Sequence, residues 1–196
     1  MSPVEWAAAA AFLWAFAEAT FFPLPPEVLL IPLILFEPET LLPVVIGALL
    51  GSLCGGTATF FWARQNSIRA RERLPRLVGV APRMVDQADQ WLGRYRDEAV
   101  AFSSWTGIPY KVFAALSGTR RGPLLVFLWV SFLARALRLL AVGWLTQQAA
   151  FRWGEEMRSR WLWVSLGYTA AAAVLYGIHQ WFWSRVRPTG GNGMMR

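Results

Sequence analysis

The sequence predicts an all-α integral membrane protein, in which a re-entrant helical hairpin followed by a transmembrane helix occurs twice as an inverted repeat, with an extra C-terminal transmembrane helix. The first indication is composition, because 56% of the 196 residues are hydrophobic, against roughly 45–50% in soluble domains. The second is a pair of apolar segments, 41–63 and 123–145, each long enough to cross a hydrocarbon core of about 30 Å. The third is a proline-broken motif that precedes each segment.

The broken motif has the same pattern in both halves of the chain. Residues 24–30 read LPPEVLL and residues 108–114 read IPYKVFA, so Glu27 and Lys111 hold equivalent positions with opposite charges. Paired apolar segments interrupted by proline, at corresponding places in two halves, indicate a transporter-type site near the bilayer midplane. We therefore expect Glu27 and Lys111 to approach each other there.

The first repeat covers residues 4–63 and begins with a hairpin over residues 4–36. Its first arm, 4–22, has a marginal length for a span, and its second arm, 23–36, is too short to cross the membrane. Proline breaks a helix because it lacks an N–H and clashes with the preceding turn. The hairpin tip is therefore placed at Pro23, Pro25 and Pro26.

The span 41–63 carries glycines at four-residue spacing, which favours a tight helix-packing face over ligand contact. The linker that follows, 64–97, is rich in arginine, and the positive-inside rule places it in the cytoplasm. Within it, residues 84–95 have an amphipathic spacing that suits a helix lying on the membrane surface or against the bundle.

The second repeat covers residues 98–147, and its hairpin breaks at Gly107 and Pro109. Arg120 and Arg121 end this hairpin on the side where the basic linker begins it, whereas acidic residues flank the first hairpin. The two hairpins are therefore expected to enter the membrane from opposite sides.

After the second repeat, residues 146–160 read as a loop of mixed charge, and residues 161–184 as a final span bracketed by tryptophans. Residues 1–187 are expected to form a single membrane domain. The glycine-rich tail 188–196 is expected to be disordered.

Five charged residues fall within the apolar segments: Glu18, Glu27, Lys111, Arg135 and Arg138. Each costs roughly 2.5–3.5 kcal/mol to insert at the centre of a membrane helix. One interpretation is that they form structural salt bridges, but two acids would then leave one of the three bases unpaired. The other is that Arg135, Arg138 and Lys111 bind an anionic substrate, since arginine donates paired hydrogen bonds to phosphate, while Glu27 and Glu18 exchange protons.

Other functional classes fit the sequence less well. Nucleic-acid binding is disfavoured because the arginines lie between apolar runs rather than on a lysine-rich polar face. The only cysteine, Cys54, and the only histidine, His179, argue against a disulfide framework, a metal site and serine or histidine nucleophile chemistry. We expect neither an enzyme nor a cofactor, and His179 is more typical of an interface histidine than of a proton relay.

Residues 16–33, FAEATFFPLPPEVLLIPL, and residues 108–118, IPYKVFAALSG, resemble the bacterial DedA family of SNARE-associated, or VTT, domain proteins, in particular its short YqaA-like branch. The paired arginines in LARALRLL extend the resemblance, which covers most of residues 5–150. It implies a multi-pass protein of the bacterial inner membrane with two re-entrant hairpins of inverted topology. Family members are linked to envelope homeostasis, and some to proton-dependent flipping of polyprenyl phosphate or phosphatidylethanolamine.

By motif, Glu18 and Glu27 match the acidic positions of the family's first hairpin, and Arg135 and Arg138 match its paired arginines. Lys111 departs from the broader family, in which an arginine or a small residue is commoner there.

The sequence thus predicts an inner-membrane lipid transporter that moves a phosphate-bearing lipid with the help of protons. The alternative is a non-transporting structural or assembly factor that binds lipid or other membrane proteins. A homodimer is left open.

Overall fold

The computed structural model describes residues 2–104 and 106–160, together with residues 167, 168, 170, 171, 174, 175, 177, 178, 181, 182 and 185. In this part of the chain every regular element is a helix, which confirms the all-α prediction. Most of the predicted final span 161–184, including His179, and the whole of the tail 188–196 lie outside the described residues. The elements are α1 (Pro3–Thr20), α2 (Glu27–Phe36), η1 (Pro38–Thr40), α3 (Leu41–Gln65), α4 (Ser67–Arg73), η2 (Leu74–Arg76), α5 (Pro82–Tyr95), η3 (Arg96–Ser104), α6 (Tyr110–Thr119) and α7 (Leu124–Ser159).

Helices α1 and α2 form the two arms of the first hairpin. Ser2 and Glu5 close the start of α1 with a capping box, in which each side chain accepts a hydrogen bond from the other residue's backbone N–H. The chain leaves helical geometry at Phe21 and re-enters it after Pro26, so the break falls at the predicted prolines. Trp14 of α1 donates its indole N–H to the carbonyl of Pro25 at 3.3 Å, which ties the tip to the first arm.

Helix α3 packs closely along α1 through its glycines. A side chain on this face would collide with backbone carbonyls of α1: Gly47 with Ala8, Gly51 with Phe12, and Gly55 with Phe16. The two backbones approach each other because glycine has no Cβ. The prediction of a helix-packing face is therefore confirmed.

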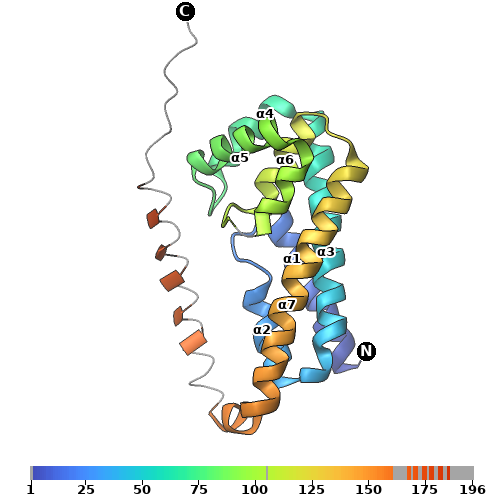
Figure 1. Cartoon of the computed structure of the whole chain (residues 1–196), viewed down its shortest axis with the longest axis vertical. Helices are drawn as coiled ribbons and strands as arrows, with labels where there is room; N and C mark the ends of the chain where they lie inside the picture. Colours follow the sequence, from blue (N-terminus) through green and yellow to red (C-terminus); the bar gives the residue numbers. More distant parts are fainter. Residues whose placement is uncertain are drawn as a thin grey trace, which may run out of the picture.

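The second arm of each hairpin packs against the long helix of the other half. Helix α2 lies along α7, and α6 lies along α3, where a Cβ on Gly118 would meet the carbonyl of Phe60. The first segment of each half contacts its own long helix, since α1 packs on α3 and η3 packs on α7. Figure 1 shows α3 and α7 running along the long axis of the bundle, with α2 near one end and α6 near the other.

Helices α4, α5 and α6 gather at one end of the molecule (Figure 1). As predicted, α5 is amphipathic, and it buries Met84, Ala88 and Leu92 in the same core as Phe113. On its outer side Asp89 pairs with Arg71 at 3.3 Å and with Arg120 at 3.0 Å. The linker is thereby attached to the end of the second hairpin.

The predicted loop at 146–160 is wrong, because α7 continues as a helix through Ser159. This stretch contains no proline, and its charged residues and glutamines are good helix formers that a solvated helix accepts. Gln147 also donates to the carbonyl of Pro38 at 2.8 Å, which fixes α7 against η1. With 36 residues, α7 is about 54 Å long at about 1.5 Å per residue.

Two of the described helical stretches, Pro38–Gln65 and Leu124–Trp153, are long and apolar enough to cross a membrane. Only 22% of the most apolar window of the second is buried within the protein. A core helix of a soluble protein would be covered by its neighbours, whereas α7 leaves large apolar side chains such as Trp129, Leu133 and Trp144 more than half exposed. This exposure supports an association with membranes.

Candidate functional site

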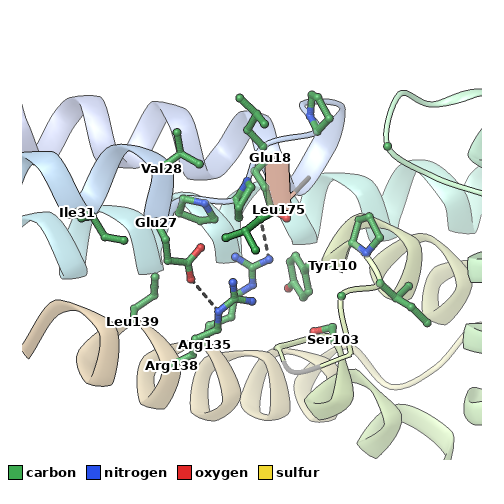
Figure 2. A pocket seen from close by; sticks show the side chains of 18 of the residues that line it. Glu18, Glu27, Val28, Ile31, Ser103, Tyr110, Arg135, Arg138, Leu139 and Leu175 are labelled. Carbon is green, nitrogen blue, oxygen red and sulfur yellow. Dashed lines mark hydrogen bonds and ion pairs between the residues drawn. The ribbon is translucent and has the colours of Figure 1, made fainter. Parts of the chain in front are cut away.

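The tips of the two hairpins meet beside α7 around a cavity of about 400 Å³. Pro23, Pro25 and Pro26 line it from the first tip, and Gly107 and Pro109 line it from the second. Glu18, Glu27, Arg135 and Arg138 contribute its charged side chains, and its polar side chains include Ser103, Tyr110 and Tyr168. Figure 2 shows both carboxylates and both guanidinium groups converging on this space.

Arg135 is the more deeply buried of the two arginines. Its Nη2 donates to Glu18 Oε2 at 2.9 Å, and its Nη1 donates to Ser52 Oγ at 2.7 Å. The guanidinium carbon lies 3.9 Å from the centre of the Tyr110 ring, a cation–π contact. Arg135 and Glu18 are only 8% and 7% exposed, so the charge pair is buried. The three partners of Arg135 come from α1, α3 and α6.

Arg138 forms the second ion pair, between its Nε and Glu27 Oε1, at 2.8 Å. Its side chain is 34% exposed, against 10% for Arg135. Glu27 Oε2 is buried and has no hydrogen-bond partner among the described residues. This second pair is therefore the more accessible one, and one carboxylate oxygen in it is unused.

Local sequence explains why these groups face the cavity. Arg135 and Arg138 are three residues apart, which places them on one face of a helix. Glu27 is the first residue of α2, where the helix dipole favours a negative charge. Glu18 follows the buried alanine face of α1, which includes Ala11 and Ala15.

Lys111 does not line this cavity, and the expected contact between Lys111 and Glu27 is wrong. Lys111 is 1% exposed, and its Nζ donates to the carbonyls of Phe22 at 2.7 Å and Phe21 at 3.4 Å. Successive residues of a helix point about 100° apart, so the α6 register that turns Tyr110 toward Arg135 turns Lys111 elsewhere. The carbonyls at the end of α1 lack helical partners, and a cation suits them.

The structure thus brings Glu18, Glu27, Arg135 and Arg138 together and separates Lys111 from them. Sequence reasoning missed Ser52, which faces Arg135, and Tyr168, whose hydroxyl donates to the Glu27 carbonyl at 2.9 Å. Nothing local marks either residue, because Ser52 lies among the packing glycines and Tyr168 in an apolar run. Among the described residues no group of three or more His, Cys, Asp or Glu side chains comes together.

Comparisons with known proteins show similarity to proteins whose activity is not named. The chain is 28% identical over 152 residues to an uncharacterized protein of Haemophilus influenzae, covering 74% of each chain. It is 25% identical over 175 residues to an uncharacterized protein of Histophilus somni, covering 83% of this chain and 84% of the relative. No family model and no solved structure matches. The similarity extends over most of each chain. Because neither relative is described by an activity, a functional conclusion depends on the geometry of the cavity.

Proposed function

We propose that this protein is a DedA-type transporter of the bacterial inner membrane, a flippase that moves a phosphate-bearing lipid such as polyprenyl phosphate or a phospholipid with the uptake of protons. The observation that carries the proposal is the cavity between the two hairpin tips, in which two arginines pair with two carboxylates. Ionisable residues at membrane depth in transporters mark substrate and proton pathways.

Helix packing supports an inverted repeat. In each half, the first segment packs on the long helix of its own half, and the second arm packs on the long helix of the other. Both halves therefore pack in the same way, as expected for two repeats related by a pseudo-two-fold axis. In transporters with such repeats the substrate site lies where the broken segments meet near the midplane, which is where this cavity would lie.

The paired arginines suggest how a phosphate enters the site. A guanidinium group binds phosphate and carboxylate with the same forked geometry, so the head group competes with Glu27 for Arg138. Arg138 is the more exposed arginine, and it would meet the head group first. Arg135, held deeper by Glu18 and Ser52, would receive it next.

Charge balance links this exchange to protons. In the unloaded site each arginine is neutralised by one carboxylate, which lowers the cost of placing charge at membrane depth. When an anionic phosphate takes the place of Glu27, the displaced carboxylate would carry an uncompensated charge unless it bound one proton. The unused Glu27 Oε2 offers a place for that proton, so one proton would accompany each head group that displaces Glu27.

The test is lipid movement between leaflets of vesicles that contain the purified protein. Labelled lipids with phosphate, phosphoethanolamine and uncharged head groups are compared at two pH values. We expect movement of phosphate-bearing lipids alone, and a loss of at least about tenfold in Arg138→Gln, because one charge-assisted contact is removed. Arg152→Gln is the matched control, since Arg152 lies exposed on the same helix outside the cavity. Equal movement of uncharged lipids, or equal rates in both variants, would contradict the proposal.

A second candidate is a non-transporting structural or assembly factor. The observation that favours it is that both ion pairs are formed and Lys111 donates to two carbonyls, so these contacts tie the helices together. Folded protein that moves no lipid in the vesicle assay would support this candidate instead.

A further inference from the structure

A second cavity, of about 320 Å³, lies where the ends of α1 and α3 meet η2 and α6. It shares no lining residue with the arginine cavity. Its walls include the apolar side chains of Phe21, Trp62 and Leu77, and two cations, Lys111 and Arg73. No carboxylate lines it.

No cation in this cavity forms an ion pair within the described part of the chain. Lys111 donates hydrogen bonds only to neutral carbonyls there, and Glu18, the carboxylate that acts on it electrostatically, is already paired with Arg135. An ammonium group has three N–H donors, so one remains for a ligand. Arg73 is exposed at the end of α4, and its side chain forms no ion pair or hydrogen bond with a described residue. Buried positive charge without a counter-ion is costly, and an anion would relieve that cost.

An apolar groove of about 730 Å³ adjoins this cavity. It lies between α3 and α7 and is lined by residues such as Leu53, Phe61 and Trp129. Ala58 lines both the cavity and the groove, so the two spaces meet along α3. The polar cavity and the apolar groove are therefore adjacent at Ala58.

The order of these features matches one kind of ligand. The cations lie at the end of α3, near Trp62, while the groove extends from Phe61 back to Leu53 at the middle of the helix. A phospholipid in one leaflet has this arrangement, with its head group at the interface and its acyl chains directed to the midplane. A free phosphate ion would not occupy the groove. A peptide would find few hydrogen-bond partners for its backbone among the apolar side chains that line it.

We propose that this cavity and groove form a second lipid site, in which Lys111 and Arg73 bind the phosphate of an anionic phospholipid and the groove between α3 and α7 holds an acyl chain. The inference rests on the membrane placement in the proposed function but does not require transport. By the predicted topology the bound lipid belongs to the cytoplasmic leaflet.

The lone cysteine provides the measurement, because Cys54 is exposed and lines the groove. Alkylation of Cys54 by a maleimide is followed in the full chain, purified in detergent, as dioctanoyl phosphatidic acid is added. We expect the lipid to slow alkylation, and Arg73→Gln to raise the concentration required by about tenfold, through loss of one charge-assisted contact. The matched control Arg69→Gln, also exposed on α4 but outside the cavity, should behave as the wild type.

Two further arms make the result specific. Inorganic phosphate should leave the alkylation rate unchanged, and uncharged dioctanoylglycerol should protect far less than phosphatidic acid. Ala58→Trp, which fills the junction, should abolish protection in protein that keeps its thermal unfolding midpoint. Equal protection by dioctanoylglycerol, or equal behaviour of the Arg73 and Arg69 variants, would overturn the second site. Protection of Cys54 without lipid movement in vesicles would contradict transport and leave this site standing.

Discussion

At the scale of single residues, Arg135 combines a carboxylate, a hydroxyl and an aromatic ring around one guanidinium group. Three contacts from three helices place it within about 4 Å of Glu18, Ser52 and Tyr110. Such a group stabilises the fold only while its charge remains paired, because a stranded buried charge costs more than the pair contributes. The ion pair therefore has a structural role that must be separated from any role in binding.

A double-variant cycle separates the two roles of this pair. Glu18→Gln alone strands the buried guanidinium group and should lower the free energy of unfolding by about 3–5 kcal/mol. Adding Arg135→Met removes the stranded charge, so most of that stability should return, measured by thermal unfolding in detergent. Lipid movement should not return in the double variant. Its recovery would show that the pair only stabilises the fold.

Asp97 predicts a pH dependence away from the spans. It is 7% exposed, and burial raises the pKa of its carboxyl, while the Ser117 hydroxyl and the Arg96 charge lower it by less. Because the pKa of this carboxyl is higher in the folded state than in the unfolded state, its contribution to stability is complete at a pH below the ordinary value of 3.8. That contribution is lost as pH rises through the folded-state pKa.

Relative to Asp97→Asn, the wild type should therefore lose stability as pH rises from below 3.8 toward neutrality. Unfolding midpoints of both proteins, measured across this range, give the comparison. If the unfolding midpoint of the wild type instead rose relative to that of Asp97→Asn as pH increased, the pKa of the Asp97 carboxyl would be lowered by folding, against this prediction.

At the scale of elements, the contact between α1 and α3 depends on glycines, which have no Cβ and therefore let the two backbones approach closely. Gly51 is the tightest of these positions, since a Cβ there would lie closest to a carbonyl of α1. The hairpin arm that carries Glu18 is placed by this contact. Any change that moves α1 outward also moves the partner of Arg135.

Gly51→Ala should accordingly destabilise the protein by about 1–3 kcal/mol, the typical cost of forcing extra atoms into a packed interface. Gly93→Ala on α5 is the control, because its nearest neighbour is the flexible end of Arg120 at 3.6 Å, and alanine favours a helix. Thermal unfolding in detergent compares the two. Similar midpoints for both variants would mean that α1 can shift without loss.

At the scale of the whole molecule, the two halves exchange their second arms, and both tips reach one cavity. The basic end, formed by α4, α5 and α6, lies at the far end of α3 from the acidic turn at Glu37 and Glu39 (Figure 1). This separation of charge along the long helices agrees with one orientation across a membrane.

Topology is testable with single cysteines in a Cys54→Ser background. A cysteine at Glu39 should react with a membrane-impermeant maleimide in whole cells, whereas a cysteine at Arg73 should react only after the cells are opened. Glu39 lies at the very start of the stretch Pro38–Gln65, and Arg73 lies beyond its other end. The reverse pattern would invert the orientation and place the second lipid site in the outer leaflet.

Local pattern alone predicted most of the helices as far as residue 145, the break at the first hairpin tip and the packing face of α3. Proline marked the tip before α2, glycine spacing marked the α1 contact of α3, and the spacing of Arg135 and Arg138 placed both on one face. These features depend on residues within a few positions of each other, so they can be predicted from the sequence.

Only the tertiary structure decided which charges meet. Glu18 and Arg135 are 117 positions apart, and their pairing depends on how far each helix is rotated and displaced in the packed bundle. The repeated motif suggested Glu27 with Lys111, but the helical register of α6 turned Lys111 to the carbonyls after α1 and left Glu27 to Arg138. The continuation of α7 through the expected loop was likewise undecided locally, because residues 146–160 suit a solvated helix as well as a loop and their contact with η1 favours the helix.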